Sequence, residues 1–151
     1  MTNEVRPLTP QEEAVWRALA PVLAQLPKAL DGDLRDGARM NVSEYGVLMN
    51  LSEAPDRQLR MNELAGRVAV SASRISRIVD AFAERGLVVK TRVDDDGRGN
   101  LATLTDAGFE RLREAWPTHL ASVRRHVIDH LSGLDLAALA AAFTAMADEI
   151  K

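Results

Sequence analysis

The feature that most constrains this chain is the run of residues 60–105, in which two short amphipathic segments are followed by two β-prone segments. Apolar side chains in residues 61–69 recur at the three- and four-residue spacing of one helix face, and residues 75–82 repeat that spacing. Only three residues separate the two segments, which allows no more than a tight turn. This order predicts a winged helix-turn-helix, with Asn62 as the N-cap of its first short helix.

The outward face of the second predicted helix carries hydroxyl and guanidinium groups. At about 100° per residue, Ser73, Ser76 and Arg77 lie opposite the apolar stripe, and Arg74 lies on its flank. Short polar side chains let a helix sit deep in a major groove, where an Arg side chain can bind guanine or a phosphate. We therefore predict a DNA-recognition helix, which Gly86 ends in the left-handed conformation. The predicted base contacts are Ser73, Ser76 and Arg77, and the predicted phosphate contacts are Ser71, Arg74 and Arg92.

The two β-prone segments, residues 87–93 and 101–104, predict a hairpin with a polar tip over residues 94–100. In a winged helix such a tip lies beside the duplex, where Arg98 can enter the minor groove. The tip also holds three consecutive Asp residues, which repel DNA unless they are paired or turned away. We expect Asp96 to hold Arg98 in position.

These motifs resemble those of the MarR family of transcriptional regulators, and the similarity extends over nearly the whole chain. The family's wing pattern, Asp-x-Arg-x-x-x-Val-x-Leu-Thr, is met by Asp96, Arg98, Leu104 and Thr105, with Ala102 in place of the usual Val. The Leu64-Ala65 pair and the serine- and arginine-rich run over residues 71–77 are also similar to the family's two DNA-binding helices. The resemblance implies a homodimer formed by the N- and C-terminal helices.

The resemblance also implies a site for a small aromatic or phenolic effector, in a cleft between the dimer helices and the winged helix. Aromatic, soft or titratable side chains on the helices that would line such a cleft are candidates, although each is a residue type more common in cores. The candidate effector residues are Trp16, Tyr45, Met49, Trp116 and His119.

Helices are predicted on both sides of the winged helix. Thr9, Pro10 and Glu12 form a capping box that begins the first helix. Pro21 and Pro27 predict that this helix is kinked or broken. The polar run of residues 31–39 is interpreted as its end and a linker, after which Ser43 or Asn41 caps a shorter helix that stops at Ala54-Pro55.

After the wing, Thr105 is expected to cap a long helix that kinks at Pro117 and reaches Leu131. A last helix begins after residues 132–135 and carries apolar side chains spaced three and four apart up to Ile150. That seam fits packing within one chain or a dimer interface. Two winged helices related by a two-fold axis reach major grooves about 34 Å apart and bind a near-palindrome, which favours the dimer.

The expected fold is therefore mainly α with a small β wing: residues 1–40 and 106–151 provide helical dimerisation segments around a winged helix-turn-helix over residues 41–105. The net charge is −3, but residues 56–100 carry nine Lys and Arg against seven Asp and Glu, so the positive excess lies on the winged helix. Without a long apolar run or a signal peptide, we expect a cytoplasmic protein that does not contact membranes.

Composition excludes several kinds of chemistry. The chain has no cysteine, which removes disulfides, thiolate metal sites and sensing by thiol oxidation. His126 and His130, with Asp129 nearby, have a spacing found in zinc sites, but with no third clear ligand we interpret them as surface or interface residues. No metal or cofactor is predicted, and no HExxH, phosphate-loop or GxSxG motif supports an enzyme.

Together, these observations predict a homodimeric, sequence-specific regulator that binds double-stranded DNA and represses transcription until a ligand releases it. The alternative is a winged-helix module that binds proteins and has lost DNA binding, in which the acidic wing tip would be part of the contact surface. A third hypothesis is a metal-responsive regulator that uses His119, His126 and His130.

Overall fold

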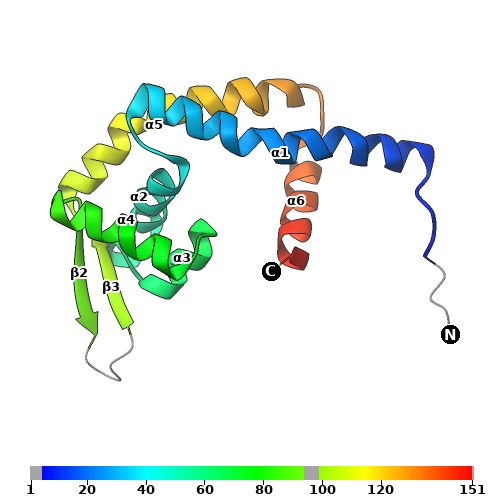
Figure 1. Ribbon diagram of the computed structural model, residues 1–151. Helices are drawn as coiled ribbons and strands as arrows, with labels where there is room; N and C mark the ends of the chain where they lie inside the picture. The colour runs from blue at the N-terminus through cyan, green and yellow to red at the C-terminus, as the bar shows by residue number, and fades with distance from the viewer. Residues whose placement is uncertain (1–4, 94–98, 151) are drawn as a thin grey trace.

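The computed structural model describes residues 5–93 and 99–150, and within them the fold is mainly helical with a small antiparallel sheet (Figure 1). The sheet has the strand order β1-β3-β2. This confirms the predicted winged helix-turn-helix between flanking helices. The elements, with η for 3₁₀ turns, are α1 (Pro10–Ala38), α2 (Val42–Glu53), η1 (Pro55–Arg57), β1 (Gln58–Arg60), α3 (Met61–Val68), α4 (Ala72–Glu84), β2 (Val88–Val93), β3 (Gly99–Leu104), α5 (Asp106–His126), η2 (Ile128–Leu131) and α6 (Leu136–Ile150).

The core of the winged helix forms where α2 and α3 contact β3 and α4 contacts β2. The apolar stripe predicted for α4 is buried, since Ile75, Val79 and Phe82 are at most 1% exposed. Ala102 is fully buried in the central strand β3, where it pairs with Leu59 of β1 and Lys90 of β2. An alanine in place of the usual valine is therefore accommodated in the middle of the sheet.

Helix α4 ends at Glu84, and Gly86, two residues later, has the expected left-handed conformation. This residue has φ +71°, and its N–H donates to the carbonyl of Ala83 at 3.0 Å. The next N–H, of Leu87, donates to the carbonyl of Phe82 at 2.9 Å. This pair of bonds satisfies carbonyl groups that the helix end would otherwise leave without partners. The chain then enters β2 directly.

Two predicted helix boundaries are wrong. Helix α3 begins at Met61, two residues earlier than an N-cap at Asn62 implies. Its N-cap is Arg60, and Asn62 lies inside the helix with its side chain accepting from the N–H of Glu63. Helix α5 ends at His126, and a separate turn of 3₁₀ helix carries the chain to Leu131. Pro117 lies inside α5 without interrupting it.

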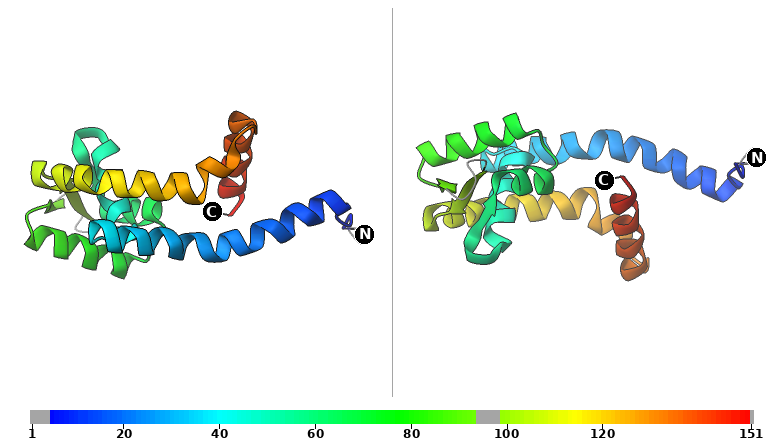
Figure 2. Two further views of the ribbon diagram at one scale, coloured as in Figure 1. Left: turned by 90° about the horizontal axis from the view of Figure 1, so that it is seen from above. Right: turned by 90° about the horizontal axis from the view of Figure 1, so that it is seen from below.

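The predicted linker over residues 31–39 is wrong, and of the two alternatives predicted for α1, kinked or broken, the break does not occur. Helix α1 is one continuous, curved helix through Pro21 and Pro27 up to Ala38 (Figure 2). Contacts with the rest of the fold keep the last turns of α1 helical, although their sequence is polar. Leu34 is fully buried in the core, and Asp31 pairs with Arg35 at 2.6 Å while accepting the N–H of Val42 at 3.0 Å.

Helices α1 and α5 lie side by side above the winged helix (Figures 1 and 2). A polar cluster joins them, in which the Asp33 carboxylate on α1 accepts from Ser122 at 2.5 Å, Arg125 at 2.6 Å and His126 at 2.9 Å, all on α5. These donors, led by Ser122, lower the pKa of Asp33 from 3.8 to about 2. Helix α6, by contrast, has no buried residue in this single chain.

The start of α5 is packed against the wing more closely than most side chains would permit. A Cβ atom on Gly108 would lie 2.1 Å from the carbonyl oxygen of Leu87 and 2.5 Å from Cδ1 of Leu104. Backbone at such a contact cannot move without displacing β2. Glycine is therefore the residue that fits here, because any Cβ atom would overlap with Leu87 and Leu104.

We expect Gly108→Ala to lower the free energy of unfolding by about 1–3 kcal/mol, because the added methyl group overpacks this contact. Urea unfolding followed by circular dichroism measures the change. The matched control is Gly66→Ala in α3, where a Cβ atom meets nothing within 4 Å and alanine should stabilise the helix by up to about 1 kcal/mol. Equal effects of the two substitutions would contradict this account.

Candidate nucleic-acid interface

The exposed face of α4 presents two arginines, of which Arg74 interacts with Asp31 only through longer-range electrostatic attraction. Arg74 and Arg77 are both exposed, and neither forms an ion pair with a described residue. The Nε of Arg77 donates to the carbonyl of Ser73, one turn earlier, at 3.4 Å, which leaves the remaining guanidinium N–H groups for a ligand. Because the opposite face of α4 is anchored in the core, these guanidinium groups are carried by a fixed helix.

The predicted serine contacts lie at the beginning of the same helix. Ser71 is the N-cap of α4, with its Oγ accepting the N–H of Arg74 at 3.2 Å and lying 3.2 Å from the Oγ of Ser73. The sequence predicted a phosphate contact for Ser71 but not this capping role. Both serines are exposed, so their hydroxyl groups remain accessible beside the helix N-terminus.

An ion pair joins α4 to the wing. Lys90 of β2 lies 2.8 Å from Asp80 of α4, and Asp80 also accepts from the hydroxyl of Ser76 at 3.2 Å. The bond from Lys90 is the largest of the effects that lower the pKa of Asp80. No role for Asp80 follows from the sequence, since its partner lies ten residues away on another element. The pair orients both Ser76 and the wing strand.

On the wing, Arg92 is exposed in β2 opposite Asn100 of β3, and it forms no ion pair with a described residue. Asp96 and Arg98 lie outside the described residues. Gly99 and Asn100, which were expected in the hairpin tip, belong to β3. The described part of the wing thus adds one free guanidinium group to the two on α4.

Of the five candidate effector residues, the structure brings two together. The rings of Tyr45 in α2 and His119 in α5 are stacked with centroids 4.1 Å apart. The hydroxyl of Tyr45 and the Nδ1 of His119 are buried without a hydrogen-bond partner. Burial raises the pKa of Tyr45 and lowers the pKa of His119, because it disfavours the charged form of each.

The other three candidates are not part of that stacked pair. Met49 is partly buried and packs against the core, whereas Trp16 and Trp116 are 57% and 51% exposed. His126 pairs with Asp33, and His130 lies 3.1 Å from the carbonyl of Arg125, so the three histidines have separate surroundings. Among the described residues, no group of three possible metal ligands is found, and no helix is long and apolar enough to cross a membrane.

Comparisons with known proteins agree with this geometry. The model of the MarR family matches residues 40–99, which span the winged helix from the end of α1 to the start of β3. The HTH-type transcriptional repressor YetL of Bacillus subtilis is 30% identical over 87 residues, which are 58% of this chain and 52% of the repressor. The chain thus matches about half the length of that curated relative.

Two solved structures from Streptomyces coelicolor match almost end to end. Sco3205, a MarR family transcriptional regulator solved in complex with DNA, is 35% identical, with a TM-score of 0.84 over 97% of this chain and 92% of its own. AbsC, another MarR family regulator, is 36% identical, with a TM-score of 0.81 over 97% and 98%. Proteins of this family are transcriptional regulators and not enzymes, as the sequence predicted for this chain. On the match of its winged helix and of its full length, this chain belongs to the MarR family of transcriptional regulators.

Proposed function

We propose that this protein binds double-stranded DNA in a sequence-specific manner and represses transcription as a homodimer on a near-palindromic operator. The observation that carries the proposal is the face of α4, where Arg74 and Arg77 form no ion pair with a residue that the structure describes. They lie beside exposed serines on a helix fixed in the core. Guanidinium groups outside ion pairs are available for guanine or phosphate. The similar structure of Sco3205, which holds DNA, supports this assignment.

Each of the predicted site residues has a place in this proposal. Ser73, Ser76 and Arg77 are proposed to read base edges, while Ser71, Arg74 and Arg92 are proposed to hold phosphates. The ion pair between Lys90 and Asp80 would keep the wing in register with the recognition helix. Asp96 and Arg98 keep their proposed role at the minor groove.

The proposed dimer is supported by apolar surface that the single chain leaves uncovered. On α6, Phe143 and Met146 are each 49% exposed and Ile150 is 84% exposed, although the helix is largely apolar. On α1 and α5, Leu23 and Leu120 are also exposed. Apolar faces on three helices at the same end of the molecule are typical of an interface between chains. We therefore propose residues 1–40 and 106–151 as the dimerisation segments, on either side of the DNA-binding domain over residues 41–105. A cytoplasmic location is also proposed.

The proposed ligand-controlled release centres on the stacked Tyr45 and His119. A buried hydroxyl and a buried ring nitrogen without partners cost stability, and a phenolic or aromatic ligand with polar groups would satisfy them. Trp16, Met49 and Trp116 are proposed to complete this site in the dimer. Such a ligand weakens operator binding only by its difference in affinity between the DNA-competent and incompetent forms.

We expect Arg77→Ala to weaken binding to the duplex upstream of the protein's own coding sequence by about 1–3 kcal/mol, because one base contact is lost. Binding to a scrambled duplex should change little. Fluorescence anisotropy at fixed salt measures both, and Arg113→Ala, an exposed α5 arginine paired with Glu110, is the matched control. If both duplexes bind equally weakly, and neither salt nor the substitution changes binding, the protein-interaction alternative is the better account.

We expect Phe143→Glu to convert the dimer into monomers, because a carboxylate would be buried in the proposed interface. Sedimentation equilibrium measures the change in mass. The control is Val89→Glu, which places the same charge on an exposed apolar site of β2, away from α1, α5 and α6. A wild-type protein that is monomeric at micromolar concentration would contradict the proposed assembly.

We expect His119→Phe to leave stability at pH 8 unchanged or to raise it by about 1 kcal/mol, because an unpaired buried nitrogen is removed. The advantage of the variant should grow as the pH falls below 6.5. Burial holds the pKa of His119 below that ordinary value, so protonation favours the unfolded wild-type chain from pH 6.5 down to the folded pKa. Urea unfolding between pH 8 and pH 5 tests this.

The same variant tests the proposed effector site. With 4-hydroxybenzoate as the phenolic compound, wild-type protein should release its upstream duplex, and His119→Phe should require a higher concentration for the same release. Equal release of DNA from both proteins at the same concentration would contradict an effector site at His119.

A further inference from the structure

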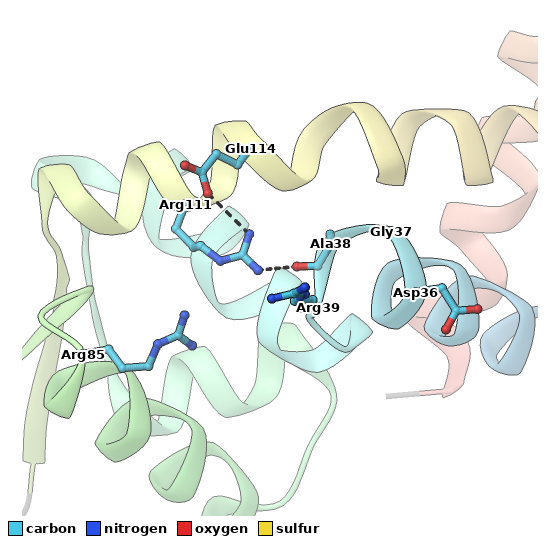
Figure 3. A pocket seen from close by; sticks show the side chains of 7 residues that line it. All are labelled: Asp36, Gly37, Ala38, Arg39, Arg85, Arg111 and Glu114. Carbon is cyan, nitrogen blue, oxygen red and sulfur yellow. Dashed lines mark hydrogen bonds and ion pairs between the residues drawn. The ribbon is translucent and has the colours of Figure 1, made fainter.

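A hollow of about 560 Å³ lies where the ends of α1 and α4 meet the first half of α5 (Figure 3). It is separate from the stacked pair of Tyr45 and His119, and it lies above the recognition helix instead of on its exposed face. Its volume is in the range of small-molecule sites. The residues that line it are Asp36, Gly37, Ala38, Arg39, Arg85, Arg111 and Glu114.

Three guanidinium groups from three helices border this hollow. Arg39 caps the end of α1, Arg85 follows the last residue of α4, and Arg111 comes from α5. Figure 3 shows them around one opening, with the carboxylate of Asp36 on its far side. Because they are 26 or more residues apart in sequence, only the fold brings them together.

The charges of these arginines are only partly balanced. Arg111, 16% exposed, donates to the carbonyl of Ala38 and lies 3.9 Å from the carboxylate of Glu114. Arg39 and Arg85 form no ion pair with any residue in the described ranges, and the guanidinium of Arg85 lies 5.8 Å from the ring centroid of Phe82. Three positive groups against two carboxylates leave a net positive hollow.

Like charges that face one opening repel each other, and an anion between them removes that cost. Guanidinium groups bind phosphoryl oxygens through pairs of parallel hydrogen bonds, with a geometry that ammonium groups do not offer. Arg39 and Arg85 can each supply such a pair, and Arg111 adds charge from a partly buried position that is fixed by its bond to the carbonyl of Ala38. A dianion with several oxygens suits this arrangement better than a single carboxylate.

We propose that this hollow binds a small molecule that carries a phosphoryl group, held by Arg39, Arg85 and Arg111. The volume exceeds that of inorganic phosphate, so the remainder of an organic ligand fits beside the phosphoryl group. The bound anion would connect the end of α4 to the end of α1 and to the first half of α5. If the proposed function holds, ligand binding here changes the orientation of the recognition helix relative to the dimerisation helices.

Isothermal titration of the full chain with pyrophosphate, in a phosphate-free chloride buffer, tests the site. We expect saturable binding by wild-type protein and about a tenfold or greater loss of affinity in Arg39→Gln and in Arg85→Gln, since each removes charged hydrogen bonds. Arg113→Gln removes the same charge from an exposed part of α5 outside the hollow and should bind as wild type does. No saturable binding, or equal weakening in all three variants, would overturn the proposal.

Binding of DNA by the same variants, without pyrophosphate, separates this site from the DNA interface. Arg39→Gln and Arg85→Gln should retain wild-type affinity for both the upstream and the scrambled duplex. If they weaken both duplexes alike, the two arginines contact the DNA backbone, and the proposed site is wrong. Saturable pyrophosphate binding by a wild-type protein that does not bind DNA would support the site while contradicting the proposed function.

Discussion

The contact on which the rest of this structure depends is made by the hydroxyl of Thr105. It donates to the carbonyl groups of Gly86 and Leu87, at 2.7 and 3.0 Å, and accepts the N–H of Gly108 at 3.0 Å. One side chain thereby links the end of the recognition helix, the start of the wing and the N-terminus of α5. The N–H of Thr105 also donates to Leu87, at 3.1 Å, so the crossing is bonded through the backbone as well. Gly108 lets the start of α5 approach the backbone of Leu87 closely. Together, these contacts fix the orientation of α5 relative to the wing.

The position of α4 is fixed by the hydrogen bonds of Thr105 and by two other sets of contacts. Its apolar stripe is buried against α2 and α3, and Asp80 ties its outer side to Lys90 of the wing. The arginines on the remaining face therefore belong to a helix that is held on both sides. Arginine on a fixed helix loses less side-chain entropy on binding than it would on a loop, which suits the proposed sequence-specific contact with DNA.

The long helices α1 and α5 connect the winged helix to the opposite end of the molecule. Asp33 receives three donors from α5, while Leu34, the next residue, is buried in the core of the winged helix. His119 of α5 stacks on Tyr45 of α2, and exposed apolar side chains lie further along α1 and α5. In the proposed dimer, movements between chains at the far end would therefore be transmitted to α4 through packed helices. Both proposed ligand sites lie on this path, one at Tyr45 and His119 and one at Arg39, Arg85 and Arg111.

Local patterns in the sequence determined the elements of this protein and much of its predicted DNA face. Spacing of apolar residues identified α3 and α4, the glycine at residue 86 identified the end of α4, and the capping residues Thr9, Asn41 and Thr105 identified helix starts, with Ser43 as the alternative to Asn41. Each of these signals acts within about one helical turn, so it can be read without knowledge of the fold. Only the tertiary structure decided that residues 31–38 are helical, that Asp80 pairs with Lys90, and that three distant arginines border one hollow. Those outcomes depend on long-range contacts, whose energies outweigh local preference and leave no periodic trace in the sequence.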